Sequence, residues 1–257
     1  MSVRPWLRRR LSRPVRVLLR KELRQFLRSR TAVLTGLLLP ALIMVVAPLV
    51  QLVAAAGGSA MRGTSTLPEG VPGMAGLTQV SDLFLYVTFP LFFVLAGLMT
   101  PSLAATHTVI SERERRSIEL LVALPVSVTD ILTAKTAANL LVAAVTLLPL
   151  FVVDATVVLV LTHAGPLYVM AALMLVLCAL TASIGISLLL ALVARDFRTA
   201  NNLNGFFVVP TMIMTGLCVT LVPGLWRFVV LSLLMLGLGG LAYLIAVRWL
   251  TFERYLT

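Results

Sequence analysis

The sequence is poor in charged residues, and this shortage argues against a soluble protein. Only 12% of the 257 residues are Asp, Glu, Lys or Arg, whereas 60% are hydrophobic and the mean hydropathy is +1.03. A soluble domain carries about a quarter charged residues. The composition therefore makes a soluble enzyme, a disordered chain and a disulfide scaffold poor candidates.

Cysteine and histidine are equally scarce. Cys178 and Cys218 both lie inside apolar runs, so they carry no information on the redox compartment. His107 and His163 are far apart in the sequence and predict no metal site. The motifs of intramembrane proteases, G-x-S-G and H-E-x-x-H, are absent as well.

The charge that is present lies almost entirely in the first thirty residues. Of the formal net charge of +11, residues 1–30 carry +10 and the remainder +1. Apolar residues recur at spacings of three and four from position 14 to 30, which predicts an amphipathic helix. Its opposite side carries four arginines, each four residues from the next: Arg16, Arg20, Arg24 and Arg28.

Such a helix fits the surface of an anionic bilayer, with its apolar face towards the lipid. Two interpretations stay equally open: a simple anchor for topology, or a helix that also docks a partner protein. Nucleic acid is a poor candidate for a partner, because the segment lies next to a predicted span and has no accompanying aromatic platform.

Long apolar runs are abundant, and a transmembrane helix needs about 20 such residues. Continuous runs of this length exclude the alternating strands of about 10 residues found in membrane barrels. Six spans are predicted, at residues 31–56, 83–105, 136–161, 167–193, 203–222 and 228–250.

The loops between these spans alternate in basic charge. Loops on one side hold 19 Lys and Arg residues, and those on the other side hold 2. The positive-inside rule therefore places both termini in the cytoplasm. We expect an all-α membrane protein with three parts: a basic cytoplasmic segment (1–30), a six-span domain (31–250) and a cytoplasmic tail (251–257).

The loop between the second and third spans contains a second predicted helix. Ser111 with Glu114 forms a capping box, and Pro125 disfavours helix at the residue before it. These signals predict a short amphipathic helix over 112–124, with a charged first half and an apolar second half. This helix is either an ordinary interfacial connector between the two spans or a segment that inserts into a cleft of a partner protein.

This loop contains the run Glu112-Arg113-Glu114-Arg115-Arg116-Ser117-Ile118-Glu119-Leu120-Leu121, followed by Leu124-Pro125-Val126-Ser127. The run resembles the first cytoplasmic loop of ATP-binding-cassette (ABC) transporter permeases of the type 2 exporter class. Lys21-Glu22-Leu23 resembles the start of the same family, and the fifth predicted span is also similar. Arg116 departs from the family, which more often has Gly there. The short turn at 223–227 is a second departure.

The resemblance implies that 112–124 is a coupling helix seated in a groove of a cytoplasmic ABC ATPase subunit. It also implies that the N-terminal helix lies along the membrane, and that two permease copies pair near the second and fifth spans. We expect the joint with the ATPase to use seven residues: Glu112, Arg113, Glu114, Arg115, Ser117, Ile118 and Leu121.

ATP itself has no predicted site on this chain. A phosphate-binding loop needs G-x-x-x-x-G-K-[ST]. The two lysines are Lys21 and Lys135, and neither follows the required glycines. We expect no cofactor here, with ATP and Mg on a separate ATPase, and hence a transport subunit rather than an enzyme.

Four polar residues within the predicted spans are candidates for the transport pathway. Asp154 is the one acidic residue well inside a span, where a structural role and a substrate contact stay equally open. Asn204, with Asn201 and Asn202, is expected to cap the fifth span or to line the inner mouth. Thr211 and Thr215 share a face, and helix packing is favoured over pathway lining.

The sequence thus favours the permease of an ATP-driven exporter for a lipid-like, amphipathic or drug cargo. A secondary carrier or channel, which would need charges within the spans, is the alternative, and a membrane scaffold is a third.

Arginine far outnumbers lysine (19 against 2), which is typical of a GC-rich genome. We therefore expect a bacterial cytoplasmic (inner) membrane protein.

Overall fold

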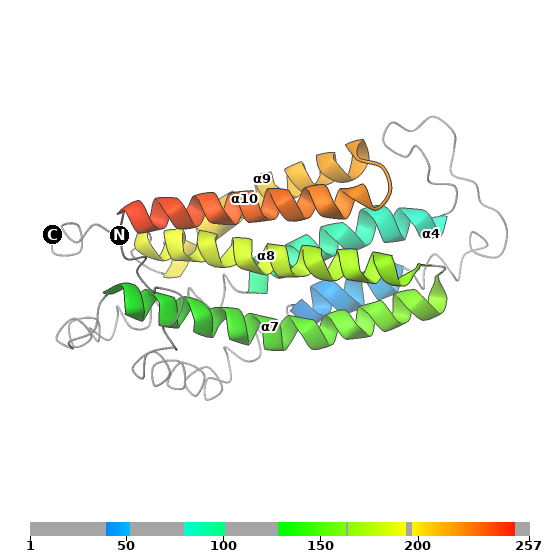
Figure 1. Cartoon of the computed structure of the whole chain (residues 1–257), viewed down its shortest axis with the longest axis horizontal. Coiled ribbons are helices and arrows are strands. Elements are labelled where there is room, and N and C mark those ends of the chain that lie inside the picture. Colours follow the sequence, from blue (N-terminus) through cyan, green and yellow to red (C-terminus); the bar gives the residue numbers. More distant parts are fainter. Residues whose placement is uncertain (1–39, 52–79, 101–127, 163, 194–196, 250–257) are drawn as a thin grey trace, which may run out of the picture.

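The computed structural model describes residues 40–51, 80–100, 128–162, 164–193 and 197–249, and in these ranges the regular structure is helical (Figure 1). The elements are η2 (Leu42–Val46), α4 (Val80–Leu83), η3 (Phe84–Thr88), α7 (Val128–Leu161), α8 (Pro166–Val193), α9 (Phe197–Leu221) and α10 (Trp226–Trp249). The predicted N-terminal and coupling helices lie outside the described residues.

Four of the described helices are long and apolar enough to cross a membrane. Their candidate spans are Ala137–Val160, Pro166–Ser187, Asn202–Leu221 and Trp226–Ala246, which correspond to the third to sixth predicted spans. Shorter apolar helices, Leu42–Gln51 and Phe84–Thr100, lie within the first two predicted spans. The all-helical, multi-pass membrane class is confirmed, and the count of six spans stays a prediction.

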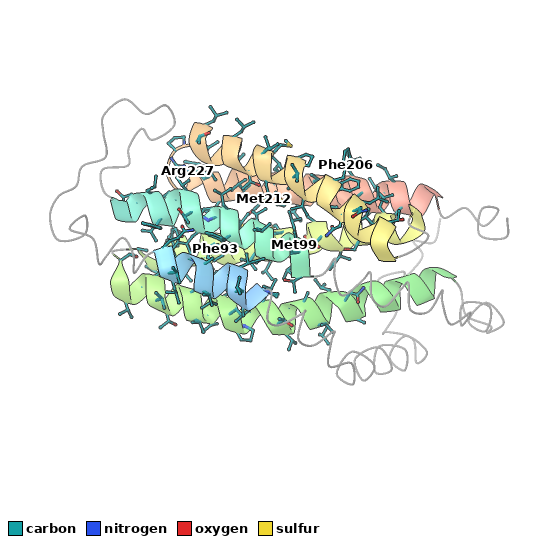
Figure 2. All side chains as sticks on the ribbon, turned by 180° about the vertical axis from the view of Figure 1, so that it is seen from behind. Phe93, Met99, Phe206, Met212 and Arg227 are labelled. Atoms are coloured by element: carbon teal, nitrogen blue, oxygen red, sulfur yellow. The ribbon has the colours of Figure 1, made fainter. Side chains whose placement is uncertain are left out.

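The bundle is built around α8. In both views α7 forms one edge, the hairpin of α9 and α10 forms the opposite edge, and α8 lies between them (Figures 1 and 2). Of the span windows, that of α8 is 56% buried and that of α7 only 28%. The core consequently centres on α8, where Leu175, Ala179 and Leu180 are fully buried.

The α8–α10 contact is the most extensive in the bundle, and glycine makes it possible. A Cβ added at Gly239 would collide with the backbone of Ala182, and one at Gly185 would collide with the carbonyl of Gly239. Small residues let helix backbones approach closely in membranes. The two helices therefore pack backbone to backbone at this point.

Two of the helices begin earlier than predicted. Helix α7 begins at Val128 rather than at 136, and α9 begins at Phe197 rather than at 203. Hydropathy detects only the apolar part of a helix, whereas both helices continue into polar sequence before that part. Pro149 in α7 and Pro210 in α9 do not end their helices.

Two helices contain π-helical turns that the sequence did not predict. η2 continues into residues 47–51, and η3 follows α4 and continues into residues 89–100. At the end of η3 the Phe89 N–H donates to the Phe84 carbonyl, five residues back. Wide turns of this kind often occur at functional sites.

Candidate functional site

Polar side chains gather at the end of the bundle where α4 and α10 begin, which the predicted topology places outside. We call this group the outer cluster: Tyr86, Asp154, Tyr168, Arg227 and Phe228. It joins η3, α7, α8 and α10. Figure 2 shows Arg227 at this end of the molecule.

Arg227 is the buried cation of the outer cluster, with 1% of its surface exposed. Its Nε donates to the Val222 carbonyl, just beyond the end of α9, and its Nη1 donates to the Tyr86 carbonyl at 3.2 Å. The guanidinium carbon lies 5.8 Å from the centroid of the Tyr86 ring. A cation at a helix C-terminus satisfies carbonyls that the helix leaves free. Arg227 therefore ties α9, α10 and η3 together.

The turn between α9 and α10 holds Arg227 in this position. Gly224 has a φ of +59°, a left-handed conformation that glycine adopts at little cost. The Gly224 carbonyl then accepts from the Arg227 N–H at 3.4 Å, and the Leu225 carbonyl from the Phe228 N–H at 3.1 Å. This tight reversal places the first turn of α10 directly beside the end of α9.

Tyr168 of α8 is the centre of the aromatic part of the cluster. Its hydroxyl donates to the Leu85 carbonyl of η3 at 2.8 Å. Its ring meets the Tyr86 ring edge to face at 5.9 Å and the Phe228 ring at 5.1 Å. Leu85 and Tyr86, which accept bonds from Tyr168 and Arg227, both belong to the π-helical turn. Side chains inserted into a helical ladder are a known cause of such irregular turns.

Asp154 of α7 is the buried anion of the cluster. Only 1% of its surface is exposed, and neither carboxylate oxygen has a hydrogen-bond partner among the described residues. A buried charge without a partner costs several kcal/mol, about as much as single residues cost at the centre of a bilayer. Asp154 lies within the candidate span Ala137–Val160, and the described residues supply no hydrogen-bond partner for it.

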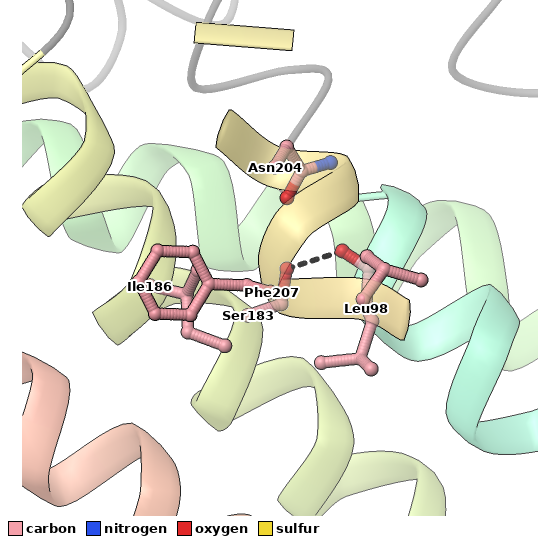
Figure 3. A pocket seen from close by; sticks show the side chains of 6 residues that line it. Leu98, Ser183, Ile186, Asn204 and Phe207 are labelled. Carbon is pink, nitrogen blue, oxygen red and sulfur yellow. Dashed lines mark hydrogen bonds between the residues drawn. The ribbon is translucent and has the colours of Figure 1, made fainter. Parts of the chain in front are cut away.

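A second polar site lies deeper in the bundle, in a narrow crevice between α8, α9 and the helix that follows η3 (Figure 3). Ser183 of α8 donates to the Leu98 carbonyl across the crevice at 2.6 Å. Asn204, Phe207 and Ile186 complete the lining. The crevice leaves no room for a water molecule, so in this state it is a closed contact between helices.

Asn204, Thr211 and Thr215 lie on the buried face of α9. The Thr211 hydroxyl donates to the Phe207 carbonyl at 2.8 Å, and the Thr215 hydroxyl to the Thr211 carbonyl at 2.7 Å. Threonines that bond to their own helix present only a methyl group to their neighbours. This geometry agrees with the favoured packing role.

The capping role expected for Asn204 is wrong. Helix α9 begins at Phe197, so Asn204 lies two turns inside the helix and its side chain is buried against the crevice. The asparagine cluster marks the start of the apolar part of α9, not the start of the helix. The alternative, that Asn204 lines the inner mouth of the pathway, stays a prediction.

The seven predicted coupling residues, Glu112, Arg113, Glu114, Arg115, Ser117, Ile118 and Leu121, lie outside the described residues, as do Arg16, Arg20, Arg24 and Arg28. Their roles stay predictions. The structure brings Asp154 into the outer cluster and Asn204 into the crevice, so the predicted pathway residues do not form one site.

Sequence reasoning missed three side chains that link helices: Arg227, Tyr168 and Ser183. Arg227 was assigned to an outer turn, whereas it lies in the first turn of α10 and is buried. Its position gave one signal, because a basic residue at an outer loop opposes the positive-inside rule. Tyr168 and Ser183 gave none, since both occur commonly in membrane helices.

The fold and these sites define a multi-pass, all-helical membrane protein with polar groups in its interior. No curated protein and no solved structure matches the chain. A sequence model of the ABC-2 family transporter proteins matches residues 16–231. The chain belongs to this family, which confirms the resemblance drawn from the cytoplasmic loop. Membership implies an ABC transporter permease that associates with ABC ATPase subunits.

Proposed function

We propose that this chain is the membrane permease of an ATP-driven exporter in the bacterial cytoplasmic membrane. The observation that carries the proposal is the family match over residues 16–231, which includes three apolar helices long enough to span a bilayer and the start of a fourth. The cargo is lipid-like, amphipathic or a drug, since the described spans offer few charges to an ionic substrate.

The energy comes from a partner chain that holds ATP and Mg. The sequence has no phosphate-binding loop of its own, so the ATPase has to attach from the cytoplasm. The segment 112–124 provides the joint, in which Glu112, Glu114 and Arg115 make the electrostatic contacts and Ile118 and Leu121 fill the groove. Closure of the ATPase subunits moves this helix, and the spans rock to open the pathway outwards.

Co-purification of the ATPase with the permease tests this joint. The double variant Glu114→Ala/Ile118→Ala is expected to lose most of the ATPase, because it removes a charged contact and an apolar anchor together. Asp82→Asn, at the start of α4 and the opposite end of the predicted topology, is the matched control. Undiminished co-purification of the ATPase with the double variant would contradict the proposed joint.

Pairing with a second permease copy is supported by the outward face of α9. Five large apolar side chains recur there at spacings of three and four, and all are exposed: Phe206, Val209, Ile213, Leu217 and Leu221. Figure 2 shows Phe206 pointing away from the bundle. A continuous apolar ridge of this kind packs against lipid or against another helix.

Disulfide cross-linking distinguishes these two neighbours. The native Cys178 and Cys218 are buried, so they do not interfere. Ile213→Cys is expected to form a covalent dimer in membranes, whereas Val145→Cys, which is equally lipid-facing on α7 at 65% exposure, is not. Equal cross-linking at the two positions would argue against pairing through α9.

A further inference from the structure

The Asp154 carboxylate lacks a counter-charge. Both of its oxygens are buried without a partner among the described residues. Buried charges in proteins are paired as a rule, and removing one partner of a buried pair is strongly destabilising. The nearest buried cation described in the outer cluster, Arg227, donates instead to the Val222 and Tyr86 carbonyls. The structure therefore presents a buried carboxyl group that no described side chain pairs with.

Aromatic residues belong to the same part of the bundle as this carboxylate. Phe151 precedes Asp154 by one turn on the buried face of α7, and its ring lies 5.7 Å from that of Phe93. Helix α8, which packs against α7, contributes Tyr168 to the same cluster, where its ring meets those of Tyr86 and Phe228. The faces of aromatic rings attract cations, most strongly where water is excluded. A carboxylate among such rings has the chemistry of a site for an organic ammonium or phosphonium ion.

The position of Asp154 also provides a route for an amphipathic ion. Helix α7 is the edge helix with the lowest burial of the four spans. Val152 and Val153, the two residues before Asp154, are both exposed on the lipid-facing side of α7. A small rotation or separation of α7 from α8 would therefore bring the carboxylate to the lipid boundary. An amphipathic molecule could then reach it with its apolar part still in the bilayer.

We propose that Asp154 binds the positively charged group of a cationic amphipathic cargo, which enters between α7 and α8 and is held by the surrounding aromatic rings. This inference rests on the proposed function, since it names the class of cargo that the exporter carries. The cation supplies the counter-charge that no described side chain gives to the Asp154 carboxylate. It thereby offsets the cost of the buried carboxylate, and this makes the site selective for positive charge.

Two probes of the same shape and opposite charge test the proposal: tetraphenylphosphonium and tetraphenylborate. Binding of each radiolabelled ion is measured on the purified permease–ATPase complex. The complex is expected to bind the phosphonium with saturation and to show no saturable binding of the borate. Asp154→Asn, which keeps the size of the side chain, should weaken phosphonium binding by about tenfold or more, equivalent to about 1.4 kcal/mol.

Two further variants keep the test decisive. Asp154→Glu retains the charge and is expected to bind the phosphonium within a few-fold of the unmodified complex, even where Asp154→Asn folds poorly. Asp82→Asn removes an acidic group outside the cluster and should leave binding unchanged. Equal phosphonium affinity of Asp154→Asn and the unmodified complex, or equal binding of the two probes, would overturn the proposal.

Failure of the proposed function gives a different result. If no ATPase co-purifies, the exporter assignment is wrong, and phosphonium binding to the permease alone still reports on the Asp154 site. If the complex assembles and hydrolyses ATP but binds both probes alike, the exporter assignment stands and the cationic cargo is rejected.

Discussion

The two sides of α8 are packed in different ways. Towards α10 the contact is made by backbone against backbone, through Gly185, Gly239 and Ala182. Towards α7, whose candidate span is only 28% buried, the contact is less extensive, and the carboxylate of Asp154 on α7 has no hydrogen-bond partner among the described residues. Small residues let helix backbones approach closely, and an extensive close contact resists separation more than a sparse one. From this comparison we predict that α8 and α10 move together as a pair and that α7 moves against them.

The largest expected effect is on the rigid side. Gly239→Ala places a Cβ against the backbone of Ala182, which has to move, and we expect a loss of about 3 kcal/mol from this overpacking. Thermal unfolding in detergent, followed by tryptophan fluorescence, measures it. Gly237→Ala is the matched control, because nothing lies within 4 Å of its added Cβ. Equal melting temperatures of the two variants would remove the argument for a close backbone contact.

The next effect concerns the outer end of α10, where Arg227 lies. Arg227→Met keeps much of the side-chain volume but leaves the Val222 and Tyr86 carbonyls without their donor. Hydrogen bonds to charged groups contribute about 1.5–3 kcal/mol, so we expect a loss of about 2 kcal/mol. Arg227→Lys should recover only part of it, because an ammonium does not reproduce the planar fork. Full stability of Arg227→Met would show that α10 is not tied to η3 by this residue.

A smaller effect is expected on the α7 side. Phe151→Leu removes the ring contact with Phe93 and leaves a branched apolar side chain in its place. Aromatic pairs contribute about 0.5–1.5 kcal/mol beyond burial, so a loss of about 1 kcal/mol is expected. The exposed Val152→Leu serves as control and should be neutral. A loss larger than that of Gly239→Ala would reverse the comparison between the two sides.

The smallest effect is expected in the inner crevice. Ser183→Ala removes the hydrogen bond to the Leu98 carbonyl. Such bonds between membrane helices contribute about 0.6 kcal/mol on average. Thr181→Ala, whose hydroxyl bonds to its own helix through the Cys178 carbonyl, is the control. If Ser183→Ala lowered the melting temperature much more than Thr181→Ala, the crevice would contribute more to stability than a single hydrogen bond between helices.

Much of the fold could be predicted from the sequence because long apolar runs dictate helices in a bilayer. The third to sixth predicted spans correspond to the four candidate spans, and the start of α9 was missed because its first turns are polar. The place of Asp154 within a span followed from its apolar run, whereas its burial did not. The linking roles of Arg227, Tyr168 and Gly239 could not be predicted, since each depends on which helices become neighbours. The π-helical turns depend on the same contacts.

The distance between spin labels tests the central claim, that α7 moves against a rigid α8–α10 pair. Cysteines at the exposed positions Val160 on α7, Met170 on α8 and Leu233 on α10 are labelled in pairs, in a Cys178→Ala/Cys218→Ala background and diluted with unlabelled chain. Addition of ATP and vanadate to the assembled transporter is predicted to shift the Val160–Met170 distance and to leave the Met170–Leu233 distance unchanged. An equal shift in both distances, or a shift in the second alone, would contradict the account.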